Sequence, residues 1–387
     1  MDVTSQNIKP IRILHVVGGM NRGGVETWLM HVLRHINRDH FRMDFLVHTA
    51  LPCAYDEEIR SLGSKIIPCL SPSRPWAYAR TFTRMLRKHG PYDVVHSHVH
   101  HYSGFVLRLA KWGRVPVRIA HSHSDTTALD MQSTLIRHLY LDIMKQWIDR
   151  NASIGLAASR QAGLALFGPN WESESNRRLL YCSVDLSRFR SRPDTKIIRA
   201  DLGLSEDAFV VGHVGRFSQP KNHRFLIEIF SEIVKREPRA HLLLVGDGEL
   251  RSTYEKTITS AGLADRVSFL GSRSDVPQIM LGAMDVFLFP SLYEGLGLAL
   301  IEAQAAGLRA IIAANIPGEV DVVKPLLRRM SLSQSSSVWA EEVISHCRGE
   351  PVCSQKDALA LVEQTGFTVT NGARTLMDLY LTHSPIK

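Results

Sequence analysis

The stretch IRILHVVGGMNRGGVE (11–26) places a β-rich apolar run directly before a glycine-rich turn, and a helical pattern follows at 25–36. Apolar runs bounded by glycines are typical of buried strands, and apolar residues spaced three and four apart indicate an amphipathic helix. The same order recurs through the first half of the chain. Further strand patterns lie at 43–48, 92–98, 115–121 and 152–159, and further helical patterns at 75–88, 103–112 and 133–149. This alternation predicts a parallel sheet.

A second series of strands begins after the polar segment SRFRSRPDTK (187–196). Its strand patterns lie at 209–215, 241–248, 267–271, 285–291 and 309–314. The sequence therefore predicts an α/β fold of two doubly wound halves, with domains at 1–190 and 191–370. The final stretch, 371–387, has helical spacing, and its pattern leaves open whether it completes the first domain. Ligands of open parallel sheets bind at the carboxyl ends of the strands, so the loops there should hold the site.

Composition narrows the class of protein. The chain has 387 residues, of which 44% are hydrophobic and 22% charged, which is typical of two globular domains and excludes a disordered or collagen-like chain. Its five cysteines are odd in number and lack a CxxC pair, which favours free thiols in a reducing compartment. We find neither a signal peptide nor about 20 consecutive apolar residues, and we expect a cytoplasmic protein without a membrane span.

Charged residues are unevenly distributed between the two halves of the chain. The net charge is +8, and residues 1–190 carry 25 Lys and Arg against 15 Asp and Glu, whereas residues 191–387 carry 21 against 23. A basic first half favours an anionic partner such as a membrane surface or a phosphorylated substrate. No basic run is interleaved with aromatic residues, so no nucleic-acid partner is expected.

One basic helix pattern suggests where a membrane would bind. The segment WAYARTFTRMLRKHG (76–90) carries four cations beside the apolar residues Trp76, Phe82 and Leu86. Basic amphipathic helices lie on anionic membranes, so this segment predicts peripheral docking on the inner membrane face. A solvated helix whose apolar stripe packs into the core is the alternative.

Glycines at the end of the first strand could receive an anion. The turn GGMNRGGVE (18–26) has neither GxGxxG spacing nor the Lys-Ser/Thr of a P-loop. Because Gly23 and Gly24 lack side chains, the backbone N–H groups of the following helix could still approach an anion closely. A tight turn without a ligand is the alternative.

The second half holds the strongest candidates. Arg216 and Lys221 follow the strand FVVGHVG on one loop, where two cations could bind a diphosphate, and neither is expected to matter for folding. In FPSLYEGLGLALIEAQAAG (289–307), Glu294 and Glu302 flank a glycine loop and could accept hydrogen bonds from vicinal hydroxyls. The N–H groups at 295–297 would add donors for phosphate. Taken singly, each of these side chains could also be a solvated surface residue.

Histidines cluster in the first half, and the spacing HxH recurs. They are His96, His98, His100, His101, His121 and His123. This spacing is compatible with a metal site, but no nearby cysteine or carboxylate completes an obvious zinc set, and we expect no metal there. His121 and His123 follow a strand, where a neutral imidazole could hold a hydroxyl.

These segments together resemble a known family, the GT-B-fold glycosyltransferases of family 4, in particular members that assemble bacterial polysaccharides. The resemblance covers nearly the whole chain and rests on the segments GGVE (23–26), DVVHSH (93–98), PVRIAHSH (116–123), GRFSQPKN (215–222), LLLVGDGELR (242–251), FLGSRSDV (269–276) and PSLYEGLGLALIEAQAAG (290–307). It implies two Rossmann-like domains facing across a cleft, with the acceptor on domain 1–190 and the nucleotide-sugar donor on domain 191–370.

The resemblance also implies roles for single residues. Arg216 and Lys221 would bind the donor diphosphate, and Glu302 the nucleotide ribose. The donor sugar and phosphate would contact the set Glu294, Gly295, Leu296 and Gly297.

On the remaining segments, Gly24 would lie against the diphosphate and Arg273 would contact the base. His121 and His123 bracket the position expected for the catalytic histidine, and we assign that role to His121. Gly297 and Ala299 stand where the family more often has Pro and Val, which leaves the donor sugar open.

The reaction implied is a retaining transfer from a UDP- or GDP-sugar to a hydroxyl of a lipid-linked or polysaccharide-precursor glycan. No Asp-x-Asp motif is present to hold a divalent cation, and Arg216 and Lys221 could stabilise the leaving diphosphate, so we expect neither a metal nor another cofactor. A nucleotide-sugar epimerase and a non-catalytic nucleotide-sugar-binding protein are the alternatives.

Overall fold

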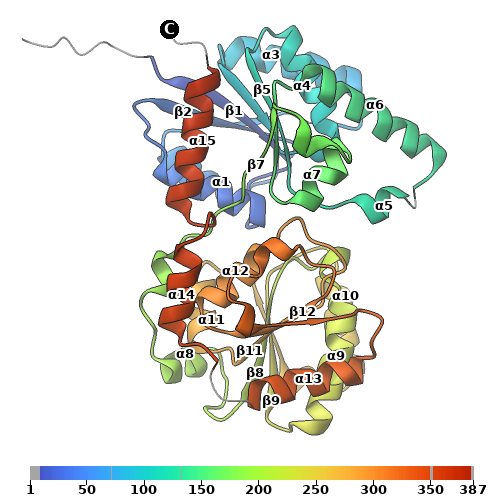
Figure 1. Cartoon of the computed structure of the whole chain (residues 1–387), viewed down its shortest axis with the longest axis vertical. Helices are drawn as coiled ribbons and strands as arrows, with labels where there is room; N and C mark the ends of the chain where they lie inside the picture. The colour runs from blue at the N-terminus through green and yellow to red at the C-terminus, as the bar shows by residue number, and fades with distance from the viewer. Residues whose placement is uncertain (1–8, 71, 132, 349–351, 385–387) are drawn as a thin grey trace, which may run out of the picture. The chain divides into compact units, whose positions relative to one another are not determined.

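The computed structural model describes residues 9–70, 72–131, 133–348 and 352–384. The chain forms two compact units, unit 1 comprising Met1–Ser183 with Val369–Lys387 and unit 2 comprising Val184–Thr368 (Figure 1). Both are α/β units built on parallel sheets, as the alternation of patterns predicted. Each is described by itself below.

Unit 1 contains a seven-stranded parallel sheet in the order β3-β2-β1-β4-β5-β6-β7. Its strands are β1 (Ile11–Val17), β2 (Phe41–Val47), β3 (Ile66–Pro68), β4 (Val94–Ser97), β5 (Val117–Ser122), β6 (Ile154–Ala157) and β7 (Arg177–Leu179). The central strands are buried on both faces because helices cover the sheet on each side, which explains their nearly continuous apolar sequence (Figure 1).

The helices of unit 1 connect these strands in the right order for parallel crossovers. They are α1 (Gly24–His35), α2 (Asp56–Ser61), α3 (Pro75–His89), α4 (Ser103–Trp112), α5 (Thr127–Met131), α6 (Leu135–Asn151) and α7 (Arg160–Phe167), with short 3₁₀ turns η1 (His100–Tyr102) and η2 (Trp171–Ser173). Local caps fix several helix starts: the Ser159 hydroxyl accepts a bond from the Ala162 N–H at the start of α7, 3.0 Å long.

The last helix, α15 (Val369–His383), returns to unit 1 and packs against α1 (Figure 1). Leu376 and Tyr380 on its inner face are fully buried. The helix predicted at 371–387 therefore completes the first unit, and the last positions of that prediction, 385–387, lie outside the described residues.

Unit 2 contains a six-stranded parallel sheet in the order β10-β9-β8-β11-β12-β13. Its strands are β8 (Phe209–Val214), β9 (Ala240–Val245), β10 (Val267–Gly271), β11 (Val286–Phe289), β12 (Arg309–Ala313) and β13 (Leu327–Met330). The helices are α8 (Thr195–Asp201), α9 (His223–Arg236), α10 (Arg251–Ser260), α11 (Val276–Gly282), α12 (Leu298–Ala305), α13 (Ser336–Arg348) and α14 (Gln355–Glu363). The 3₁₀ turns are η3 (Leu186–Phe189), η4 (Gln219–Lys221), η5 (Ala264–Arg266), η6 (Gly318–Val320) and η7 (Lys324–Leu326).

Each sheet has one point where the strand order reverses direction. In unit 1 this lies between β1 and β4, and in unit 2 between β8 and β11. The carboxyl edge of the sheet at such a point is where open α/β sheets bind ligands.

Two expectations from the sequence need correction. The units separate after Ser183 and not after residue 190, because Leu186 and Phe189 of η3 are buried in unit 2, where the Phe189 carbonyl accepts a bond from Gln355 Nε2 at 3.0 Å. In α3, Phe82 and Leu86 face the core, so its apolar stripe is not free for a membrane, although Trp76 is exposed. No described helix is long and apolar enough to cross a bilayer.

Candidate functional site

Two loops meet at the point of reversal in unit 2, one after β8 (215–222) and one after β11 (290–297). The Leu292 N–H donates to the Pro220 carbonyl at 2.7 Å, and Asn222 Nδ2 donates to the Pro290 carbonyl at 3.0 Å. Asn222 has φ +54°, a left-handed conformation that Asn adopts more readily than most residues. The two loops thereby form one connected surface at the carboxyl edge of the sheet.

Lys221 and Glu294 form an ion pair between these loops. Their Nζ and Oε1 atoms are 2.6 Å apart, and their side chains are only 19% and 10% exposed. Lys221 Nζ also lies 4.9 Å from the centre of the Phe289 ring, a cation–π contact. The ammonium is therefore fixed in position, and the pair links Lys221 to the stability of the fold in a way that the sequence did not suggest.

Arg216 is the second cation of the predicted pair. Its side chain is exposed, and it makes no ion pair or side-chain hydrogen bond with any residue that the structure describes. One cation is thus held by a carboxylate while the other is free to meet an anion.

The loop before α12 supplies backbone donors beside these cations. Gly297 has φ +96°, a conformation that favours glycine, and it directly precedes the first helical residue. Within the described part of the chain, the N–H groups of Gly295, Leu296 and Gly297 have no hydrogen-bond partner. They lie at the positive end of the helix dipole, where an anion is stabilised.

Glu302 lies on α12, eight residues after Glu294 of the preceding loop, and its side chain is partly buried. Burial raises the pKa of its carboxyl from the usual 4.5 to about 7. Its carboxylate has no hydrogen-bond partner among the residues described, so both oxygens remain available to hydroxyl donors.

Arg273 follows β10 at the same edge of the sheet. Its guanidinium binds both oxygens of Asp275, at 2.8 and 2.6 Å, and this raises its pKa. Asp275 therefore already orients the guanidinium of Arg273, the residue predicted to contact the base.

Gly24 belongs to unit 1, where it is the first residue of α1 and is exposed. The carboxylate of Glu26 lies close to Gly23, so a Cβ at Gly23 would clash with it. The amino end of α1 thus already has an anionic side chain beside it.

His121 belongs to a buried histidine cluster at the point of reversal of unit 1. The cluster comprises His15, His96, His98, His121 and His123. His15 Nδ1 is 3.0 Å from His98 Nε2, and His98 Nδ1 is 2.8 Å from His123 Nε2. A second series of hydrogen bonds joins the Tyr380 hydroxyl to His96 Nδ1 (2.8 Å) and His96 Nε2 to His121 Nδ1 (3.2 Å).

The two candidate catalytic histidines differ in their partners. His123 uses both ring nitrogens, because Nδ1 also lies 3.4 Å from the Cys182 thiol. His121 is fully buried, and its Nε2 has no hydrogen-bond partner among the described residues, although the Leu180 backbone lies close enough to raise its pKa slightly. Desolvation dominates and lowers the pKa of His121 well below 6.5, so its ring is neutral at pH 7.

Sequence reasoning missed several members of these sites. His15, Cys182 and Tyr380 come from segments far apart in the chain, and only the sheet order and the return of α15 bring them to His98, His123 and His96. Asn222 could have been found, because an Asn just before a helical pattern is a common turn signal.

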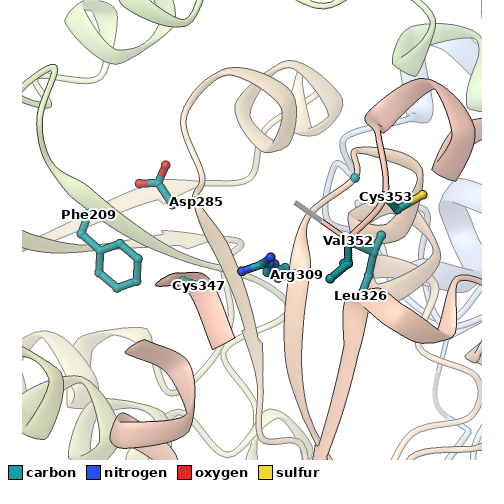
Figure 2. A pocket seen from close by; sticks show the side chains of 8 residues that line it. Phe209, Asp285, Arg309, Leu326, Cys347, Val352 and Cys353 are labelled. Carbon is teal, nitrogen blue, oxygen red and sulfur yellow. The ribbon is translucent and has the colours of Figure 1, made fainter. Parts of the chain in front are cut away.

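Unit 2 also has a pocket of about 360 Å³, which lies away from the predicted site. Figure 2 shows Phe209, Asp285 and Arg309 among its lining residues. These residues begin or precede β8, β11 and β12, so the pocket lies at the amino edge of the sheet, opposite the predicted site. Asp285 is bound by Arg199 at 2.8 Å, and Arg309 donates to the His346 carbonyl, which indicates structural roles for both.

Comparison with known proteins gives the family. A model of glycosyl transferases group 1 matches residues 194–347, and a model of the glycosyl transferase 4-like domain matches residues 23–167. EpsF of Bacillus subtilis (strain 168), which is named as a glycosyltransferase, is 35% identical over 379 residues, covering 95% of this chain and 96% of EpsF. The chain belongs to the group 1 glycosyltransferases.

Two further relatives agree with this assignment. The capsular polysaccharide biosynthesis glycosyltransferase CapH of Staphylococcus aureus is 25% identical over 376 residues, covering 96% of this chain and 99% of CapH. The crystal structure of HepE from Anabaena in complex with UDP and glucose has a TM-score of 0.80 at 21% identity, covering 97% of this glycosyltransferase and 100% of HepE. The HepE match confirms the GT-B fold.

Proposed function

We propose that this glycosyltransferase is a retaining enzyme that moves a sugar from a nucleotide-sugar donor to a hydroxyl of a lipid-linked or polysaccharide-precursor glycan. The observation that carries the proposal is the site at the carboxyl edge of unit 2. There two neighbouring loops carry the Lys221 ammonium, held by Glu294, together with the Arg216 guanidinium and the backbone N–H groups at 295–297, which have no hydrogen-bond partner among the described residues.

This arrangement suits a diphosphate. Arg216 would bind phosphate oxygens with its planar fork, and Lys221 would act as a fixed point charge. The leaving nucleoside diphosphate gains negative charge in the transition state, so cations placed before reaction begins lower the barrier. HepE was crystallised with UDP and with UDP-glucose, and its fold likeness makes a UDP-sugar the first donor to test, followed by a GDP-sugar.

The other residues receive supporting roles. Glu302 would accept hydrogen bonds from the ribose hydroxyls, Glu294 would contact the donor sugar, and Arg273, oriented by Asp275, would contact the base.

In unit 1, His121 would act on the transferred sugar through Nε2, which lacks a partner among the described residues; because the ring is fully buried, the cluster would have to open for the sugar to reach it. Gly24 would lie against the diphosphate, an assignment supported by its exposed position at the start of α1.

Transfer should need no divalent metal or other cofactor, because Arg216, Lys221 and the helix N-terminus already supply positive charge where the leaving group forms. Activity in excess EDTA is expected to equal activity in added magnesium. Loss in EDTA that magnesium or manganese restores would contradict this.

The decisive experiment replaces the two cations. Arg216→Ala and Lys221→Ala are each expected to lower kcat/KM by one to two decades, since a charge-assisted hydrogen bond contributes about 1.5–3 kcal/mol. The double variant should lose less than the sum, because both cations serve one diphosphate. Arg224→Ala is the matched control, since Arg224 is an exposed neighbour on α9 paired with Glu228.

Acceptor dependence separates the transferase from its alternatives. The protein is incubated with a UDP-sugar, with and without a cell-envelope lipid extract. Nucleotide release that requires the extract supports transfer, whereas a changed sugar without release indicates an epimerase. Wild-type turnover in the folded Arg216→Ala/Lys221→Ala protein would overturn the diphosphate assignment.

A membrane-bound acceptor requires the enzyme to reach a lipid surface, and α6 offers a suitable face. Leu135, Ile136 and Leu139 are 88%, 84% and 62% exposed, and Met131 at the end of α5 is 76% exposed. Large apolar side chains gathered on one exposed face mark an interaction surface. We propose that this α5–α6 surface enters the interface of an anionic cytoplasmic membrane, where Arg137 and the basic first half of the chain meet the lipid charge.

A further inference from the structure

The histidines at the point of reversal in unit 1 have the geometry of a metal-binding triad. One ring nitrogen of each of His98, His121 and His123 lies within 4.8 Å of the others. Two nitrogens bound to one tetrahedral Zn²⁺ at 2.0–2.1 Å lie about 3.3 Å apart. The observed separation of 2.8 Å between His98 Nδ1 and His123 Nε2 is close to that value, so small ring movements would admit an ion in place of the shared proton.

The second nitrogen of each ring already has an outer partner. His98 Nε2 lies 3.0 Å from His15 Nδ1, and His121 Nδ1 lies 3.2 Å from His96 Nε2. His123 Nδ1 lies 3.4 Å from the Cys182 thiol. Metal-binding histidines are normally held in this way, with one nitrogen facing the ion and the other bonded to a supporting group. A hydrogen-bonded histidine network without an ion requires no such division.

Two further observations bear on a ligand between the rings. His121 Nε2 is buried and makes no geometrically formed hydrogen bond within the described chain, although the Leu180 backbone lies close to the ring. His98 and His123 are partly exposed, whereas His121 is fully buried.

We propose that His98, His121 and His123 bind a divalent transition-metal ion such as Zn²⁺, with a fourth position left to water. His15, His96 and Cys182 support the three ligands from outside. Imidazole suits Zn²⁺, Co²⁺ and Ni²⁺ rather than Mg²⁺, which prefers oxygen. The ion is therefore distinct from the divalent cations that other glycosyltransferases use at a diphosphate.

The ion regulates the enzyme by inhibition, a consequence that rests on the proposed function. A metal bound to His121 Nε2 consumes the atom assigned to the transferred sugar, so an occupied triad and a working His121 exclude each other. Sugar transfer then needs no metal. We expect its rate to fall when Zn²⁺ is added and to recover when EDTA removes the ion.

The test uses Co²⁺ as a spectroscopic probe, titrated into the untagged full chain without substrate. We expect one Co²⁺ per chain, with the strong visible absorption of a four-coordinate site that has three nitrogen ligands and no thiolate charge-transfer band. His98→Asn and His123→Asn should weaken binding at least about a hundredfold, and Cys182→Ser about tenfold to a hundredfold. His48→Asn is the matched control, since His48 is a histidine of the same unit whose ring bonds to the Tyr78 hydroxyl at 3.0 Å.

Binding that His98→Asn and His123→Asn leave unchanged, in variants with wild-type circular dichroism, would overturn the proposal, as would absence of stoichiometric Co²⁺ binding. A thiolate band would move Cys182 into the ligand set and overturn its supporting role. The readout is independent of turnover: Co²⁺ binding by an inactive chain would contradict the proposed transfer alone, whereas activity without Co²⁺ binding would contradict the triad alone.

Discussion

Lys221 serves two purposes in this enzyme, because the cation proposed to bind the diphosphate is also the partner of Glu294. Breaking a buried ion pair from one side leaves an uncompensated charge. Lys221→Met is therefore expected to lower the free energy of unfolding by about 3 kcal/mol, measured by urea denaturation.

Two further variants check the cause. Lys221→Met/Glu294→Gln should regain most of the lost stability, because no buried charge remains, and Arg216→Ala should stay within about 0.5 kcal/mol of the wild type. Equal loss in the single and double variants would show that the pair is not coupled.

Glu302 should make stability depend on pH. Its folded pKa of about 7 lies above the usual 4.5, so this group's contribution is fully present below pH 4.5 and is lost as pH rises through 7. Glu302→Gln removes that loss and should be more stable than the wild type at pH 8 by up to about 3 kcal/mol, with little difference near pH 4.5. Thermal denaturation of both proteins from pH 4.5 to 8 measures this.

The same ionisation should affect nucleotide binding in the opposite sense. The proposed ribose contact needs the ionised carboxylate as acceptor, so UDP affinity of the wild type should fall as pH drops below 7, while that of Glu302→Gln should be weak and flat. A wild-type affinity independent of pH between 6 and 8 would argue against the ribose contact.

At the scale of elements, α15 carries a side chain into the histidine cluster. The buried Tyr380 hydroxyl bonds to His96 Nδ1, and His96 in turn bonds to His121. Tyr380→Phe should cost about 1–3 kcal/mol, because it leaves a buried histidine nitrogen without a partner. Histidine ¹⁵N chemical shifts should also show a changed proton position on His96, which simple loss of packing would not produce.

A control on the same helix isolates the hydroxyl. Leu381→Ala alters an exposed residue next to Tyr380 and should remain within about 0.5 kcal/mol of the wild type with unchanged histidine shifts. Unchanged shifts in Tyr380→Phe would mean that α15 contributes packing alone.

At the scale of the whole molecule, charge and apolar exposure both favour unit 1 as the membrane-binding half. The protein should float with anionic liposomes at low salt and dissociate as salt rises, because screening weakens the attraction. Leu135→Asp/Ile136→Asp should weaken binding by at least tenfold, since burying one such side chain contributes about 1.5–3 kcal/mol.

Leu361→Asp provides the comparison, because Leu361 is an exposed leucine on α14 of unit 2. It should bind liposomes like the wild type. Equal binding by all three proteins would exclude the α5–α6 surface.

Much of the architecture follows from local sequence. Strands inside the sheets are apolar on both faces and short, so their pattern predicted β1, β8 and β12 within a residue at each end. The edge strands β3, β7 and β13 escaped prediction because three or four residues of mixed polarity carry too little periodicity.

The sequence by itself also determined the loops after β8 and β11 as the candidate site, because their cations and carboxylates lie within short segments whose strand-to-helix position can be read directly. Only the tertiary structure decided how these residues pair. Lys221 and Glu294 are 73 positions apart and meet because β8 and β11 are neighbours at the point of reversal. Tyr380 reaches His96 across 284 positions because α15 returns to unit 1. Such contacts depend on sheet order, which no local pattern encodes.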